Sequence, residues 1–207
     1  MKISVSILNA KDKKETIKIL NNTDISYFHI DVMDGHFVSQ TSIPVEETIE
    51  LSRVSEKKLD IHLMHSSPLT YIEKIKDIKN IEYITIHLEI EENIQNTLNK
   101  IREYGFKSGI SIKPNTDINK LIPYLNDIDL ILIMTVEPGL GGQPFLESSP
   151  NRIKKIKELV KDKDILLEVD GGINNKTISL VKDSDIAVVG SYITTSDNMI
   201  EKVKTLV

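Results

Sequence analysis

Eight short apolar runs recur along the chain, separated by longer segments rich in Lys, Glu, Asn and Leu. The runs are rich in β-branched residues, and their starts lie roughly 20 to 35 residues apart, which is room for one strand, one helix and two short loops. They are residues 3–8, 27–32, 59–64, 83–88, 108–113, 130–135, 165–170 and 186–190. This alternation favours an α/β fold built on a parallel sheet.

Two of the intervening segments show a clear helical period. They are residues 11–22, with Ile17 and Leu20 at helical spacing, and residues 151–162, with Ile153, Ile156, Leu159 and Val160 on one face. Eight strand–helix pairs without a break in composition predict one domain over residues 1–207, a single (β/α)8 TIM barrel. A doubly wound open sheet is the alternative, but the GxGxxG expected after its first strand is absent.

Composition narrows the possible functions. The formal charge of -5 is mild and lysines are mixed with acids along the chain, so the basic stripe of a nucleic-acid-binding protein is not expected. Because the chain has no cysteine, a metal ion would have to be held by histidine and carboxylate. The first residues have too short an apolar stretch for a signal peptide, and no run approaches membrane-spanning length. The expected setting is the cytoplasm.

From His29 the second run continues into the segment HIDVMDGHFV (29–38). This segment carries more ionisable groups than a buried strand usually tolerates. His29 and Asp31 share a face, since residues two apart in a strand point the same way. His62 and Asp170 lie near the carboxyl ends of two other runs, where a barrel places its active site. Taken singly, such residues are usually core histidines or turn aspartates. Together they predict a four-ligand site for Zn, Fe, Mn or Co.

For other residues of these runs the sequence gives weaker evidence of a functional role. Met33, Met64 and Met134 would each be core filler if taken alone. Asp34 follows the second run in a DGH turn, and we interpret it as turn or supporting structure.

Glycines follow the last three runs, in TVEPGLGGQPF (135–145), VDGGI (169–173) and VVGS (188–191). Glycine lets backbone amides approach an anion without a Cβ in the way. In TIM barrels a phosphate commonly sits on the loops after strands seven and eight. Gly171, Gly172, Gly190 and Ser191 would lie there. One GG pair could be only a tight turn, but two glycine sites on adjacent strands predict an anion site made by backbone amides and a helix N-terminus.

Seven motifs occur in the order and strand positions of ribulose-phosphate 3-epimerases: SVSIL, HIDVMDGHFV, DIHLM, ITIHLE, MTVEPGLGGQPF, VDGGI and VGS. The chain resembles this family over nearly its whole length, and the second and fifth motifs are long and specific. The resemblance implies a barrel of the ribulose-phosphate-binding type with one divalent metal ion. It also implies interconversion of D-ribulose 5-phosphate and D-xylulose 5-phosphate in the pentose phosphate pathway, and a homo-oligomeric assembly.

The resemblance also implies roles for individual residues. The metal ligands would be His29, Asp31, His62 and Asp170, with Asp31 and Asp170 also forming the acid/base pair. The substrate would be bound by Ser6, His62, Gly139, Leu140, Gly141, Gly142, Gly171, Gly172, Gly190 and Ser191. Inverting a carbon next to a carbonyl needs one carboxylate on each face and a Lewis acid for the enediolate charge. Met33, Met64 and Met134 are expected to line the site and keep water from the enediolate.

The chain departs from the family pattern at Val5, Ser39, Gln40, His65 and Lys113. None of these changes removes a proposed ligand or acid/base. Lys113 replaces a usual Asn; its charge would either approach the mouth and alter pKa values or simply reach solvent. These changes bear on substrate identity more than on reaction type.

Three other functions remain open. D-Allulose-6-phosphate 3-epimerases share the HIDVMDGHFV and GQPF stretches, although VDGGI and the GLGG loop favour the pentose substrate. A barrel that binds a sugar phosphate without turnover would not need both carboxylates. A decarboxylase of the same fold would call for a DxKxxD constellation, which the sequence lacks.

Overall fold

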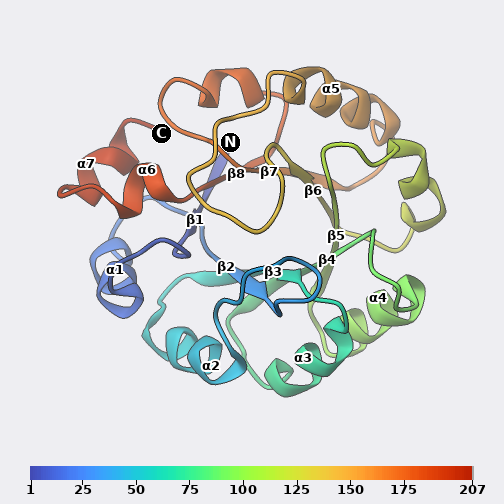
Figure 1. The fold of residues 1–207 in the computed structure, drawn as a ribbon, viewed down its shortest axis with the longest axis horizontal. Helices are drawn as coiled ribbons and strands as arrows, with labels where there is room; N and C mark the ends of the chain where they lie inside the picture. Colours follow the sequence, from blue (N-terminus) through green and yellow to red (C-terminus); the bar gives the residue numbers. More distant parts are fainter. Residues whose placement is uncertain (207) are drawn as a thin grey trace.

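The structure is a computed structural model that describes residues 1–206. Eight parallel strands follow one another around a closed barrel, and the last pairs with the first (Figure 1). They are β1 (Lys2–Ser6), β2 (Tyr27–Met33), β3 (Lys58–Met64), β4 (Ile81–His87), β5 (Lys107–Ile112), β6 (Leu130–Met134), β7 (Leu166–Asp170) and β8 (Ile186–Val189). The predicted TIM barrel is confirmed.

Helices form an outer ring around the strands (Figure 1). They are α1 (Lys13–Leu20), α2 (Val45–Val54), α3 (Pro68–Ile75), α4 (Ile94–Glu103), η1 (Ile118–Tyr124), α5 (Ser149–Leu159), η2 (Ile178–Val181), α6 (Ser191–Thr194) and α7 (Met199–Lys204). The helices that follow β5 and β7, η1 and η2, are 3₁₀ helices. Pro123 lies inside η1 and has no N–H to donate, which disfavours a continuous α-helix.

The two segments with a clear helical period are helices. Asp12 caps α1 by accepting a hydrogen bond from the Glu15 backbone N–H at 3.0 Å, which satisfies one of the unpaired donors at the helix start. Ile17 and Leu20 are buried on its inner face. In α5, which ends at Leu159, the predicted apolar face packs inward in the same way.

The core has an aliphatic layer between barrel and helices and a second part inside the barrel. At the amino-terminal ends of the strands the barrel interior is apolar and aromatic, and Tyr27 and Tyr83 meet edge to face with centroids 5.6 Å apart. Toward the carboxyl ends the buried interior becomes polar. The side chains there are Ser4, Ser6, His29, Asp31, Asp60, His62, Thr85, His87, Ser111 and Glu168. A barrel interior is normally filled with branched apolar residues, so this polar half is where chemistry is to be sought.

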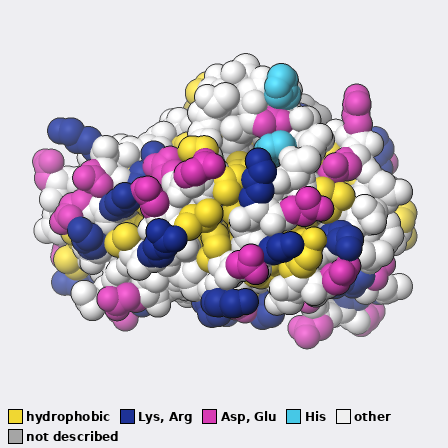
Figure 2. Space-filling view, turned by 90° about the horizontal axis from the view of Figure 1, so that it is seen from below, with side chains coloured by type: hydrophobic (Ala, Val, Ile, Leu, Met, Phe, Trp, Pro, Cys, Tyr) yellow, Lys and Arg dark blue, Asp and Glu magenta, His cyan; other side chains and the backbone are white. Residues whose placement is uncertain are grey.

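On the face shown in Figure 2, basic and acidic side chains are interspersed, with no stripe of one sign. Ion pairs such as Lys14–Glu50, at 2.6 Å, link neighbouring helices on the surface. Among residues 1–206, no helix is both long and apolar enough to cross a membrane.

Candidate active site and metal centre

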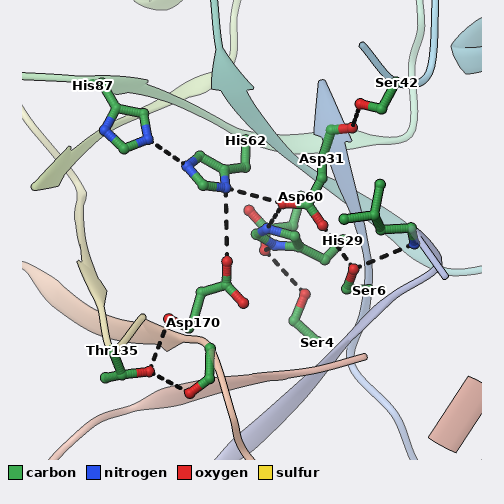
Figure 3. A network of polar contacts seen from close by, with 12 residues as sticks. Ser4, Ser6, His29, Asp31, Ser42, Asp60, His62, His87, Thr135 and Asp170 are labelled. Carbon is green, nitrogen blue, oxygen red and sulfur yellow. Dashed lines mark hydrogen bonds and ion pairs between the residues drawn. The ribbon is translucent and has the colours of Figure 1, made fainter. Parts of the chain in front are cut away.

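Two histidines and two aspartates converge inside the barrel near the carboxyl ends of β2, β3 and β7 (Figure 3). They are His29, Asp31, His62 and Asp170, and one potential ligand atom from each lies within 4.8 Å of all the others. The histidines are fully buried, whereas the Asp170 side chain is 18% exposed. The structure therefore brings together the four residues that the sequence singled out.

His29 is oriented by a carboxylate behind it. Its Nδ1 lies 2.6 Å from Asp60 Oδ2, and Asp60 also accepts a hydrogen bond from Ser4 Oγ at 2.9 Å. When His29 Nδ1–H donates to Asp60, the lone pair of a neutral ring is on Nε2. That Nε2 is buried, has no hydrogen-bond partner among the described residues, and faces Asp31 Oδ1 at 3.3 Å. A buried nitrogen lone pair beside a carboxylate fits a metal ligand.

His62 uses its other nitrogen. Its Nδ1 lies 3.1 Å from Asp31 Oδ1 and 3.9 Å from Asp170 Oδ2, while its Nε2 faces His87. The two imidazoles thus reach the same point through different ring nitrogens. With two carboxylate oxygens, they form a donor set suited to Zn, Fe, Mn or Co.

The two aspartates of the site differ in electrostatics. Burial alone would raise the pKa of Asp31, but His29 and His62 lower it below its usual range. Ser6 Oγ also donates to Asp31 Oδ2 at 2.7 Å. Burial and the nearby charge of Asp31 raise the pKa of Asp170 to about 6. The pair therefore holds one carboxylate that ionises readily and one that holds its proton more strongly.

A second acidic pair lies deeper in the barrel. Asp60 and Glu168 are fully buried. Burial, followed by the charge of Asp60, raises the pKa of Glu168 well above its usual value. Burial opposes ionisation of Asp60, but the neighbouring His29 lowers its pKa. His29 is thus flanked by Asp31 on the cavity side and by Asp60 on the inner side.

A cavity of about 920 Å³ opens above the site. Its lining includes Ser6, Asp31, Met33, Met64, Met134, Asp170, the loop Gly139–Gly142, Gly171, Gly172, Gly190 and Ser191. His29 and His62 lie behind the aspartates and do not line it. The structure thus places the predicted substrate-binding residues on the cavity wall, except for His62.

Two glycines let the loop after β7 pack tightly against the loop after β6. Gly171 and Gly172 have φ of +121° and +68°, in the region that favours glycine. A Cβ on Gly171 would lie 2.4 Å from Val136 Cγ2, and one on Gly172 would lie 2.5 Å from the Phe145 backbone nitrogen. Thr135 Oγ1 also donates to the Gly171 carbonyl at 2.6 Å. The end of the cavity expected to take an anion is therefore built from closely packed backbone.

Several residues of the site went unrecognised in the sequence. Asn9 Nδ2 donates to Ser191 Oγ at 2.8 Å across the cavity wall. Asp60 lies on the same face of β3 as the assigned His62, so alternation could have indicated it. His87 is the last residue of β4, and its place at a strand end could have indicated it. Glu89 follows β4 in a loop; it ends the ITIHLE motif, but nothing in that motif shows what its side chain contacts.

The position of Lys113 shows how one departure from the family pattern is accommodated. Its Nζ lies 4.2 Å from the Phe37 ring centroid, and the Phe37 ring lies 4.6 Å from that of His87. Burial, with smaller contributions from His62 and Lys113, lowers the pKa of His87 to about 4 against the opposing effect of Glu89. The charge of Lys113 therefore lies on the side of the site where His87 contacts His62.

Comparisons with known proteins identify the family of the chain. Residues 2–194 match the Ribulose-phosphate 3 epimerase family. The chain is 34% identical to ribulose-phosphate 3-epimerase of Bacillus subtilis, over 93% of this chain and 92% of that protein. It is 31% identical to ribulose-phosphate 3-epimerase of Methanocaldococcus jannaschii, over 100% of this chain and 89% of that protein.

Solved structures support the fold alone. One is 3-hexulose-6-phosphate synthase from Salmonella typhimurium, with a TM-score of 0.67, 14% identity and coverage of 100% of this chain and 96% of that chain. Another is the tryptophan synthase alpha subunit from Campylobacter jejuni, with a TM-score of 0.71, 13% identity and coverage of 100% and 95%. The sequence matches are what decide the family: the chain belongs to the ribulose-phosphate 3-epimerase family, whose named members are isomerases acting on carbohydrates.

Proposed function

We propose that this protein is a metal-dependent epimerase that inverts C3 of D-ribulose 5-phosphate to give D-xylulose 5-phosphate. The observation that carries the proposal is the convergence of His29, Asp31, His62 and Asp170 within 4.8 Å, with both carboxylates on the wall of a large cavity. Family membership supports the reaction class.

The proposed ligands of one divalent ion, Zn, Fe, Mn or Co, are His29 Nε2, His62 Nδ1 and one oxygen each of Asp31 and Asp170. The unpartnered, buried Nε2 of His29 supports this assignment. A bound cation would supply Lewis-acid stabilisation of the negative charge that develops on the substrate oxygens.

The proton transfer is assigned to the two aspartates. Asp31 comes from β2 and Asp170 from β7, and both border the cavity. One carboxylate removes the C3 proton from one face of the sugar, and the carboxylic acid of the other returns a proton to the opposite face. The roles exchange when the reaction runs backward. We assign substrate contact to Ser6 as well, since its Oγ donates to Asp31 and the residue lines the cavity.

The rest of the cavity is assigned to holding the sugar phosphate. Backbone amides of the glycine loops after β6, β7 and β8, with Ser191, would bind the phosphate group. Met33, Met64 and Met134 are buried side chains on the cavity wall. We propose that they keep water away from the enediolate.

The test is isotope exchange at C3. Metal-loaded protein is incubated in deuterium oxide with D-ribulose 5-phosphate or, separately, D-allulose 6-phosphate, and deuterium at C3 is followed by NMR. We expect exchange with the pentose phosphate. Exchange only with the hexose phosphate would reassign the substrate, and exchange with neither would reject the epimerase in favour of a binding protein.

A further inference from the structure

His62 contacts a third histidine that the proposed chemistry does not use. The Nε2 atoms of His62 and His87 are 2.9 Å apart, and both side chains are fully buried (Figure 3). Two ring nitrogens at this distance share a single hydrogen, because a hydrogen bond needs one donor and one acceptor. What the far ends of the two rings contact decides which nitrogen carries that hydrogen.

The far end of His87 contacts a carboxylate. His87 Nδ1 lies 3.1 Å from Glu89 Oε2, and because an ionised carboxylate only accepts, Nδ1 carries a hydrogen. In a neutral ring the other nitrogen is then an acceptor, so His87 Nε2 accepts from His62 Nε2–H. His62 Nε2 thus carries the shared hydrogen. Its Nδ1 faces Asp31 Oδ1 at 3.1 Å and Asp170. Without a cation, the acceptor-only carboxylate of Asp31 holds a second hydrogen on Nδ1, and a metal ion would displace that hydrogen and take the lone pair.

Glu89 is itself held from its other side. Its Oε1 accepts from the Lys113 backbone N–H at 2.9 Å and from the Thr116 hydroxyl. Arg152 in turn donates to the carbonyl oxygens of Lys113 and Thr116. Burial opposes ionisation, but the hydrogen bonds from His87, Thr116 and Lys113 lower the pKa of Glu89 to about 2. Glu89 is therefore a carboxylate at neutral pH.

We propose that His87 and Glu89 are positioning residues that keep the hydrogen of the His62–His87 bond on His62 Nε2 and so leave Nδ1 as the nitrogen that a metal ion takes. The inference rests on the proposed role of His62 as a metal ligand. Neither His87 nor Glu89 lines the cavity, so they act through His62 rather than on the substrate. Partners of this kind fix ring orientation and raise the basicity of the ligating nitrogen.

Glu89→Gln is the most specific perturbation, because it should reverse the chain of hydrogen bonds. The Gln amide oxygen would keep the Lys113 N–H and the Thr116 hydroxyl, which leaves its NH2 group facing His87 Nδ1. His87 Nδ1 would then accept, its Nε2 would carry the hydrogen, and His62 would be left protonated on Nδ1. Glu91→Gln makes the same change at an exposed position two residues away and serves as the control.

The first measurement is whether His62 Nε2 carries a hydrogen in metal-free protein, from the ¹⁵N shifts of its two ring nitrogens; the chain has five histidines to assign. We expect a hydrogen on Nε2 in the unmodified protein and in Glu91→Gln, and a hydrogen on Nδ1 alone in Glu89→Gln. The second measurement is Co²⁺ affinity by calorimetry. We expect it to fall about 10- to 100-fold in Glu89→Gln and to stay unchanged in Glu91→Gln.

A His62 Nε2 without a hydrogen in the unmodified protein would overturn the inference without requiring any variant to fold. So would a Glu89→Gln protein in which the hydrogen stays on His62 Nε2 or the Co²⁺ affinity is unchanged. The proposed metal function fails separately if the unmodified protein takes up no divalent ion. In that case the measurement on His62 Nε2 in metal-free protein still decides whether His87 and Glu89 orient His62.

Discussion

The two aspartates assigned to proton transfer have different surroundings. Asp31 accepts a hydrogen bond from Ser6 and lies beside two imidazoles, whereas Asp170 is partly exposed to the cavity. Their pKa values are shifted in opposite directions, Asp31 downward and Asp170 upward to about 6. Environments that separate the pKa values of two carboxyl groups are typical of acid/base pairs.

We expect Asp31→Asn and Asp170→Asn each to abolish C3 isotope exchange in both directions, with a loss of at least about 100-fold, because an amide can neither take nor return the proton. Circular dichroism should show that both variants keep the fold, since Asn is close to Asp in shape. Asp162→Asn, at an exposed position, is the control. Retained turnover in either Asp31→Asn or Asp170→Asn would refute the assignment of that residue.

At the scale of strands and loops, the sequence predicts the barrel better than the connections. Continuous apolar, β-branched runs place the strands, because both sides of a barrel strand are buried. The period of two along a strand puts His29 and Asp31 on one face. Asp60 was not recognised as the partner of His29, because the bond depends on the register of β2 against β3. The role of Glu89 depends on loop contacts that no local pattern encodes.

A prediction for the loop after β7 separates the effect of positive-φ strain from the effect of a packing clash. Gly172→Ala forces a Cβ within 2.5 Å of the Phe145 backbone, so we expect the loop after β6 to shift and KM for the sugar phosphate to rise. Gly105→Ala is the matched control, because Gly105 has φ +87° but nothing within 4 Å of an added Cβ. Both variants should lose about 1–2 kcal/mol of unfolding free energy, measured in urea, because an L residue disfavours positive φ, and Gly172→Ala should lose more because of the clash. An equal KM in the two variants would contradict the packing argument.

The loop after β2 depends on Asp34, which the sequence suggested as a turn residue. Its Oδ1 accepts from the backbone N–H groups of His36 and Phe37, and its Oδ2 accepts from the backbone N–H and the hydroxyl of Ser66. Burial opposes ionisation, but these hydrogen bonds lower the pKa of Asp34 below its usual range. The carboxylate therefore joins the loop after β2 to the loop after β3.

Asp34→Asn should cost about 1–3 kcal/mol of unfolding free energy at pH 7. A lowered folded-state pKa stabilises the fold above the unfolded value of about 3.9 and loses that stabilisation as the pH falls through the folded value. The difference in unfolding free energy between the unmodified protein and Asp34→Asn should therefore narrow as the pH falls below about 4. Urea unfolding at several pH values measures this difference, with exposed Asp24→Asn as the control. A difference that stays constant or widens would rule out the Asp34 carboxylate as its source.

At the scale of the whole molecule, closure of the barrel creates the site. The candidate ligands come from β2, β3 and β7, and β7 lies across the barrel from the other two (Figure 1). A cation held by all four side chains would link both sides of the barrel and bind only the folded chain. Metal binding should therefore stabilise the whole barrel against unfolding.

Removing the metal should lower the melting temperature as well as activity. A ligand that binds only the folded state at 100 times its Kd contributes about 2.7 kcal/mol. In a chain of this size that corresponds to a shift of roughly 5–10 °C. We expect calorimetry to show this loss after chelation and its recovery on adding back Zn²⁺, Fe²⁺, Mn²⁺ or Co²⁺. Asp170→Asn, which lacks one ligand, should show a smaller shift. An unchanged melting temperature together with unchanged C3 exchange after complete chelation would mean that these four residues serve catalysis without a metal.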